Sequence, residues 1–219
     1  MTEVTIQAHG HVAQDSLGAA GEETWVGLKA SKRGDLVIID WYKQMALEGR
    51  VFQVRAGTIT TPLVGDVVIT DASAEMCADA AVGTTIIPSY LNIGIRLGTG
   101  TLHEYAAKSV GAVSTAGTAF VPLNLLLGGA AAASTARVAA AGAVTVAAEL
   151  ATTTRRHWTY SNPVAVAAGN EVTTMEWKPV APPVVNGAGC FYVQIAATTT
   201  GPSYYANFDY VELPTANIN

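Results

Sequence analysis

The chain has 219 residues, half of them hydrophobic, and only 13% are Asp, Glu, Lys or Arg. An average soluble domain carries roughly 25% charged residues, so this chain has little charge with which to cover a free surface. Because the cores of protein interfaces are depleted in charge, the composition favours a surface that is buried against copies of the chain or against other partners. The length fits one large all-β domain.

The formal net charge of −5 excludes a strongly basic nucleic-acid-binding surface. Basic residues are scattered, apart from Lys29, Lys32 and Arg33 and the pair Arg155 and Arg156. Acidic residues are interspersed within residues 1–34, which we expect to form an N-terminal arm or a first strand. This segment is therefore no basic arm for a genome, and we expect no direct binding of nucleic acid.

The first residues, MTEVTIQAHGHV, lack a basic stretch followed by an apolar core. We therefore expect no secretory signal and synthesis in a host cytoplasm.

Alternation of apolar and polar residues, punctuated by Gly and Pro, predicts strands along the whole chain. Residues 48–50 are predicted as a hairpin turn between the second and third strands. The expected strands are VTIQAHGHV (4–12), DLVIIDWYKQMAL (35–47), RVFQVRAGTITT (50–61), VGDVVIT (64–70), GTTIIPSYLNIGIRLG (83–98), HWTYSNPVAV (157–166), EVTTMEWKPV (171–180), GCFYVQIAATTT (189–200) and YYANFDYVEL (204–213).

One short helix is predicted for ASAEMCADAA, residues 72–81, with Asp71 or Ser73 as its cap and Gly83 at its end. The proline-rich segment 178–189 is predicted as a rigid loop between two strands. Strands without βαβ alternation indicate an antiparallel sandwich or barrel. The absence of a repeat of 20–50 residues disfavours propellers and solenoids.

The alanine-rich segment 124–150 carries only two charges, Arg137 and Glu149. Interrupting Gly, Ser and Thr residues argue against a membrane span. Alanine favours helix, but the β-branched residues after Gly142 and the flanking patterns favour strand. We predict that 136–150 is mostly strand and 130–135 a loop or short helix. Its small side chains would let another subunit approach closely, but a tightly packed internal layer would require small side chains equally.

The closing stretch PPVVNGAGCFYVQIAATTTGPSYYANFDYVELP, with TTIIPSYLNIGIRL in the middle of the chain, resembles single jelly-roll structural proteins of viruses and phages. This resemblance implies an all-β antiparallel sandwich of jelly-roll type, with one or two short helices, over residues 35–219. It also implies assembly through the sides of the sandwich, often as trimers, into or onto a shell. The acidic N-terminal region departs from the basic arm of many RNA-virus coats and fits a DNA phage better.

Candidate metal ligands are few, and we expect neither a metal site nor a cofactor. His9 and His11 share one face of a strand but have no evident third ligand, whereas zinc sites need three or four. Cys77 and Cys190 lie far apart in sequence without metal-ligand spacing; a single disulfide between them is one alternative, and we predict two free, buried thiols that pack as small hydrophobes. Asp66, Asp71 and Asp79 lack the pattern of a calcium loop, which favours turn and cap roles.

No catalytic residues are predicted, and we expect that the protein is not an enzyme. His103 and His157 have no nucleophile motif beside them. Glu176, Asp209 and Glu212 would make a glycosidase pair only if the fold brought two of them together. We expect instead that these acids face solvent or a subunit boundary, while Trp177, Phe208 and Tyr210 pack inside.

These observations predict a virion structural protein that associates with copies of itself and with other virion proteins, without membrane binding. The expected contact residues are Arg155, Arg156, Trp158, Tyr204 and Tyr205, because exposed Tyr, Trp and Arg are enriched at interfaces. Two alternatives remain. One is a carbohydrate-binding or receptor-binding sandwich that uses Trp158, Trp177 and the tyrosines, and the other is a jelly-roll glycoside hydrolase or lyase.

Overall fold

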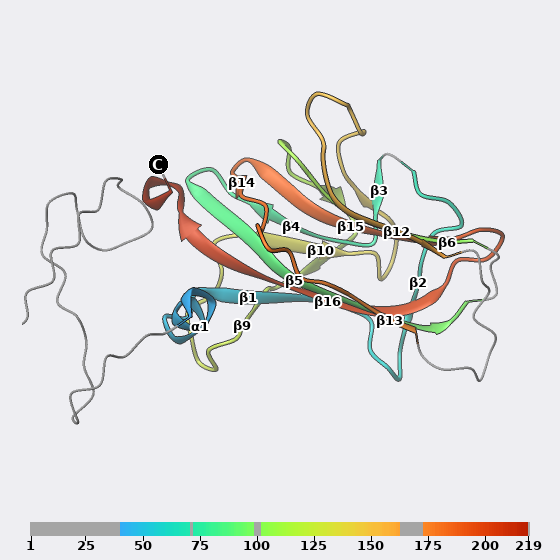
Figure 1. The fold of residues 1–219 in the computed structure, drawn as a ribbon, viewed down its shortest axis with the longest axis horizontal. Coiled ribbons are helices and arrows are strands. Elements are labelled where there is room, and N and C mark those ends of the chain that lie inside the picture. The colour runs from blue at the N-terminus through green and yellow to red at the C-terminus, as the bar shows by residue number, and fades with distance from the viewer. Residues whose placement is uncertain (1–39, 71, 99–101, 163–172, 219) are drawn as a thin grey trace, which may run out of the picture.

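Two antiparallel sheets packed face to face form the body of the protein in a computed structural model, which describes residues 40–70, 72–98, 102–162 and 173–218 (Figure 1). The seven-stranded sheet has the order β13 (Thr173–Trp177), β5 (Thr84–Leu97), β16 (Ser203–Pro214), β1 (Val51–Ala56) and β9 (Leu123–Asn124), with β14 (Val185–Asn186) paired to β5 and β2 (Leu63–Val64) paired to β16. The six-stranded sheet has the order β12 (Arg155–Asn162), β6 (His103–Val110), β15 (Gly189–Ala197), β4 (Met76–Ala80), β10 (Thr135–Val138) and β8 (Thr118–Phe120). The predicted all-β sandwich is confirmed.

A third, small sheet of β3 (Ser73–Ala74), β11 (Val144–Thr145) and β7 (Thr115–Ala116) accompanies the two large ones. Its residues Ala74 and Val144 pack with Cys77, Cys190 and Tyr192 of the six-stranded sheet. These three side chains lie on the face of that sheet opposite the sandwich interior. The small sheet therefore covers part of the outer face of the six-stranded sheet.

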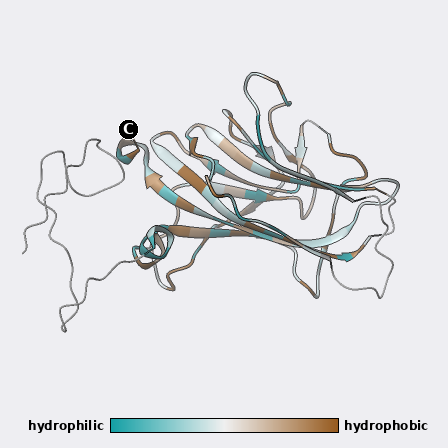
Figure 2. Cartoon of the chain, in the orientation of Figure 1, coloured by the Kyte–Doolittle hydropathy of each residue, from teal (hydrophilic) through white to brown (hydrophobic). Residues whose placement is uncertain are grey.

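The main core lies between the two sheets, and strand alternation explains its composition. Along β16, buried and half-buried residues alternate, so Phe208 and Tyr210 share the inner face as predicted. Phe208 meets Phe191 of β15 edge to face, with ring centroids 5.2 Å apart, and so links the two sheets. Figure 2 shows hydrophobic residues recurring along β5, β15 and β16.

The predicted strand at 35–47 is wrong where the structure describes it, because Trp41–Leu47 forms helix α1. The Asp40 side chain caps this helix by accepting hydrogen bonds from the Tyr42 and Lys43 backbone N–H groups at 3.0 and 3.3 Å. Tyr42, Met45 and Ala46, at helical spacing, pack against residues of β1, β5 and β16. The predicted hairpin turn at 48–50 is instead the helix end, where Gly49 adopts a positive φ of 68°.

The predicted helix at 72–81 is also wrong, because these residues form β3 and β4. Alternate residues of β4 point to two apolar layers, Met76 and Ala78 into the main core and Cys77 toward the small sheet. A strand buried on both faces loses the polar alternation that marks strands in sequence. Its alanines then resemble a helix, and tertiary packing overrides their propensity.

The alanine-rich segment is only partly strand, since β10 and β11 are short and loops join them. Val144 and Val146 are buried in the cluster beneath the small sheet, and Ala139 and Ala147 pack against it. The small side chains here accommodate an internal layer. The predicted strand 64–70 is wrong beyond Val64, which lies in β2, although Asp66 forms an isolated bridge with Ala196. The proline-rich loop contains the short β14. The predicted strand 4–12 lies outside the described residues.

The helices of the described residues are α1 and the 3-10 helix η1 (Thr215–Asn217). Neither is long and apolar enough to cross a membrane.

Candidate self-association surface

Three of the predicted contact residues lie together on β12, the edge strand of the six-stranded sheet. Arg155 and Arg156 are exposed at its start. Trp158 is half-buried, packs against the main core and stacks on Tyr160 with ring centroids 6.3 Å apart. An edge strand presents backbone groups to other chains, so β12 can contact a partner through both its backbone and its arginines.

The other two predicted contact residues do not join this surface. Tyr204 is fully buried and its hydroxyl bonds to Glu75, so its prediction as a contact residue is wrong. The alternation along β16 turns Tyr204 into the sandwich and Tyr205 outward. Tyr205 is half-buried on the outer face of the other sheet, where its ring covers Gly94. A single interface of all five residues is therefore not formed.

An ion-pair network borders β12. Lys108 of β6 donates to Glu149 at 2.6 Å, and Arg156 pairs with the same carboxylate. The hydrogen bond from Lys108, helped by that from Arg156, lowers the pKa of Glu149 against the opposing effect of burial. The side chains of Lys108 and Glu149 are only 5% and 12% exposed, whereas that of Arg156 is 65% exposed. The inner pair is thus structural, and Arg156 remains accessible.

Two open hollows meet at Arg156. One, of about 350 Å³, is lined by residues of β6 and β12 that include Glu104, Tyr105 and Tyr160. The other, of about 450 Å³, is lined by Glu149, Ala151, Thr154 and Arg156. A partner segment could enter either hollow and meet a mixed charged and aromatic wall.

One exposed apolar segment was not identified by sequence reasoning. Residues 121–127, VPLNLLL, include β9 at the edge of the seven-stranded sheet, beside α1 (Figure 1). Their exposed aliphatic side chains include Val121 and Leu127, which are 74% and 99% exposed. Asn124 fixes the segment by donating hydrogen bonds to the backbone oxygens of Gly49 and Ala130, both at 2.8 Å. The signal was present in the three consecutive leucines, and we call residues 121–127 the leucine segment.

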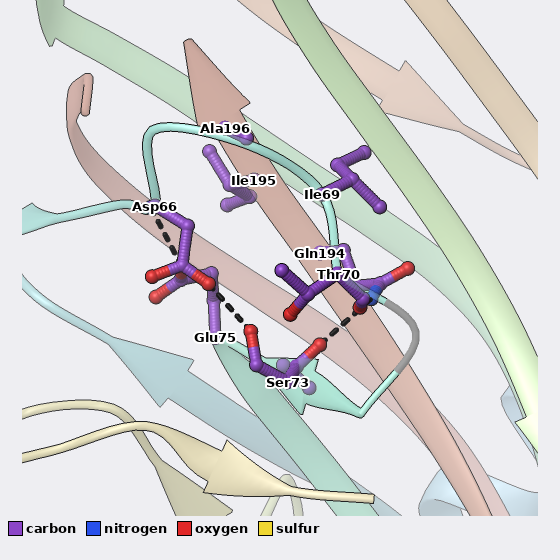
Figure 3. Close-up of a pocket in the computed structure, with 9 residues that line it drawn as sticks. Asp66, Ile69, Thr70, Ser73, Glu75, Gln194, Ile195 and Ala196 are labelled. Carbon is purple, nitrogen blue, oxygen red and sulfur yellow. Dashed lines mark hydrogen bonds between the residues drawn. The ribbon is translucent and has the colours of Figure 1, made fainter. Parts of the chain in front are cut away.

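The buried Glu75 and the half-buried Asp66 lie together near the start of the small sheet (Figure 3). Glu75 accepts hydrogen bonds from the Tyr204 hydroxyl and the Asp66 backbone N–H, both at 3.0 Å. Asp66 in turn accepts one from the Ser73 hydroxyl at 2.5 Å. Burial first, and then the Asp66 charge, raise the pKa of Glu75 to about 8. Glu75 is therefore mostly protonated at neutral pH.

This carboxyl cluster is closed rather than a cleft. Gln194 donates hydrogen bonds to the backbone oxygens of Thr70 and Ser73 at 2.6 and 2.7 Å, which holds the preceding loop against β15. The space between the lining side chains has essentially no volume, 0 Å³, for a water-sized molecule. The cluster fastens the chain and offers no room for a substrate.

The three acids of the hydrolase alternative have separate partners. Glu176 is exposed and accepts a hydrogen bond from Tyr90 at 3.0 Å. Asp209 accepts one from Gln53 at 2.8 Å, and Glu212 accepts from the Ser134 backbone N–H at 2.8 Å. Each of the three carboxylates thus accepts a hydrogen bond from a different residue.

The histidines divide into three cases. His9 and His11 lie outside the described residues. His103 is buried and bonds through Nδ1 to the Tyr105 hydroxyl at 3.0 Å. His157 Nε2 lies 2.8 Å from Ser109 Oγ, a nucleophile and base arrangement that the sequence did not reveal because the residues are on different strands. Burial, and then the Arg155 charge, lower the pKa of His157.

Among the described residues, no carboxylate holds the other ring nitrogen of His157 by a hydrogen bond. The third member of a catalytic triad is thus missing from the described part of the chain.

The aromatic residues of the carbohydrate-binding alternative are mostly interior. Trp177 stacks on Phe191 with ring centroids 5.8 Å apart. Tyr192, Tyr204 and Tyr210 are fully buried. Trp177 therefore packs inside, as predicted, and these tyrosines present no surface to a sugar.

Cys77 and Cys190 are free, buried thiols, which confirms the prediction. Asp79 lies in β4 rather than in a turn or cap, so the role predicted for it is wrong. Burial first, and then the neighbouring Cys77 and Asp79, raise the pKa of the Cys190 thiol, which is therefore neutral. The pairing of β4 with β15 brings these three residues together, although 111 or more residues separate Cys190 from the other two.

Comparisons of this chain with protein-family models, with curated proteins and with solved structures find no match.

Proposed function

We propose that this chain is a structural subunit of a virus or phage particle, a jelly-roll sandwich that acts by associating with copies of itself, as a trimer, and with other virion proteins. The activity is geometric rather than chemical. The observation that carries the association is the exposed leucine segment at a sheet edge of a chain with few charges.

The order of strand pairing supports the jelly-roll assignment. Eight strands have five or more residues, and they pair from the outside of the sequence inward: β1 with β16, β4 with β15, β5 with β13 and β6 with β12. Each of these pairs is antiparallel. A long hairpin of four strands against four, wound into two sheets, has this pairing, which is that of a double Greek key.

The exposed surface supports association. Contiguous exposed segments of large aliphatic side chains mark protein-binding surfaces. The reason is that burying apolar surface against a partner stabilises the complex by roughly 25 cal/mol for each Å². The leucine segment lies at the end of the strand order, next to β1, so a neighbouring subunit can reach it without disturbing the sandwich. The resemblance of the closing strands to viral coat proteins then favours a virion as the assembly.

The first experiment is light scattering behind a sizing column over a concentration series of the full chain. We expect a trimer or larger closed assembly that persists on dilution. Leu127→Asp should reduce its mass to that of a monomer, because an aspartate cannot be buried unpaired. Val180→Asp is the matched control, since Val180 is equally exposed but lies in the proline-rich loop.

A stable wild-type monomer would refute self-association. An assembly that Leu127→Asp leaves intact would instead remove the leucine segment from the interface. Electron microscopy of the assembled fraction tests the virion assignment, which requires closed shells, lattice fragments or trimers that attach to a shell.

A further inference from the structure

A buried cluster of two thiols and a carboxyl group lies on the outer face of the six-stranded sheet. Cys190 of β15 stands opposite Asp79 of β4, and Cys77 is two residues before Asp79 on the same strand. Because residues two apart in a strand share a face, all three side chains point away from the main core. The three ligand atoms lie within 4.8 Å of one another.

The cluster is sealed from solvent. Cys77 and Cys190 have no exposed surface, and Asp79 is 3% exposed. Apolar residues that include Ala74 and Val144 of the small sheet pack against the two cysteines, and the buried Ser114 lies beside Cys77 and Asp79. The site is thus rigidly held on two central strands and covered by a separate layer.

Asp79 is an unusual residue for this environment. Its two carboxylate oxygens accept hydrogen bonds from the Ser114 N–H at 2.8 Å and the Ser114 hydroxyl at 2.6 Å. Among the described residues, no lysine, arginine or histidine forms an ion pair with it. Burying a carboxylate is costly unless it is paired or coordinates a metal. The hydrogen bonds offset part of this cost, and a bound cation would offset the rest.

The donor set matches zinc. In a tetrahedral site with Zn–S bonds of about 2.3 Å, the sulfur atoms are roughly 3.8 Å apart, so a contraction of about 1 Å or less brings the cluster to that geometry. Thiolates select soft or borderline ions, and a single carboxylate is compatible with zinc. Ser114 Oγ already lies 3.1 Å from Cys77 Sγ and beside Asp79, where a fourth donor is needed.

We propose that Cys77, Asp79 and Cys190 bind one zinc ion, with the Ser114 hydroxyl completing the coordination. On binding, the two thiols lose their protons to solvent, and two thiolates and one carboxylate surround the dication. With four protein donors and no open position, the site is structural. It fastens β4 to β15 beneath the small sheet and is separate from the association surface proposed above.

The test uses the full chain, unfolded with chelator and reductant and then refolded with Co²⁺ as the spectroscopic probe. The wild type should take up one equivalent and show the intense near-ultraviolet absorption of thiolate-to-cobalt charge transfer with visible bands of tetrahedral Co²⁺. Zn²⁺ should abolish these bands by displacement. Asp79→Asn, which keeps the size of the side chain, should weaken binding by at least about tenfold, as loss of a metal-site group typically does.

Cys77→Ala and Cys190→Ala should abolish the charge-transfer band, whereas Asp209→Asn, which alters a carboxylate of the other sheet, should retain it. Replacing His9 and His11 with alanine should also leave binding unchanged. Folded wild-type protein without the charge-transfer band would overturn the proposal. So would a disulfide between the cysteines in the isolated protein, or binding that is lost with the two histidines.

Discussion

Replacing Glu75 with glutamine should remove a pH dependence of stability that this buried carboxyl imposes on the fold. Glu75 accepts hydrogen bonds from Tyr204 and from the Asp66 backbone, and its pKa is raised to about 8 by burial and by the Asp66 charge. The folded state therefore binds this proton more tightly than the unfolded state. The stabilisation is complete below about pH 4.5, the ordinary pKa, and is lost as pH rises through about 8.

The size of the effect follows from the pKa. One pH unit corresponds to about 1.36 kcal/mol, so a rise from 4.5 to about 8 sets an upper limit near 5 kcal/mol. Rearrangement of the surrounding groups and entry of water reduce such costs in real proteins. We expect the wild type to lose roughly 2 to 4 kcal/mol of unfolding free energy, relative to Glu75→Gln, between pH 5 and pH 9.

The assay is urea unfolding at one-unit steps of pH, followed by tryptophan fluorescence, for the wild type and Glu75→Gln. The difference between the two proteins isolates Glu75, because every other group titrates in both. Asp66→Asn should shrink the effect by removing the second cause of the raised pKa. Glu176→Gln is the control, since Glu176 is exposed. Free energies of wild type and Glu75→Gln that run parallel across this pH range would refute the reasoning.

Two pairs of substitutions test the ion-pair network and the close approach of the chain at Gly201. Glu149→Gln leaves Lys108 buried without its partner and should cost about 3 kcal/mol of unfolding free energy, whereas Arg156→Ala at the exposed end should cost less than about 1 kcal/mol. Equal losses in chemical denaturation would contradict this division. Gly201→Ala places a Cβ 1.7 Å from a backbone oxygen of the neighbouring loop and should lower stability by about 1 to 3 kcal/mol. Gly111→Ala meets open space and should leave the thermal midpoint nearly unchanged, and the reverse order would show that the loop contact is misplaced.

The sequence predicted most of the long strands. In β16 the alternation predicted the strand and the burial of Phe208 and Tyr210, but Tyr204 on the same face was predicted as a contact residue and is buried. β5 and β15 were recognised from runs of β-branched and aromatic residues between turn signals. These features are local, so a single strand carries enough information to reveal them.

Local patterns failed at β4 and at α1. β4 looked helical because its alanines fit closely between two layers. The sequence of α1 resembled a strand. The Asp40 cap and the packing of Tyr42 and Met45 against the sheet decide that it is a helix. The layers that cover β4 and the sheet residues that pack on α1 come from parts of the chain distant in sequence, whereas the Asp40 cap is adjacent to the helix.

The sequence by itself thus determined the all-β class, the low-charge surface and most long strands, because composition and alternation act over a few residues. Only the tertiary structure decided which side chains meet. It buried Tyr204 against Glu75 and exposed the leucine segment at a sheet edge. It also brought Cys190 beside Cys77 and Asp79. These outcomes depend on strand order and register, which pair residues across more than a hundred positions and leave no periodic trace in the chain.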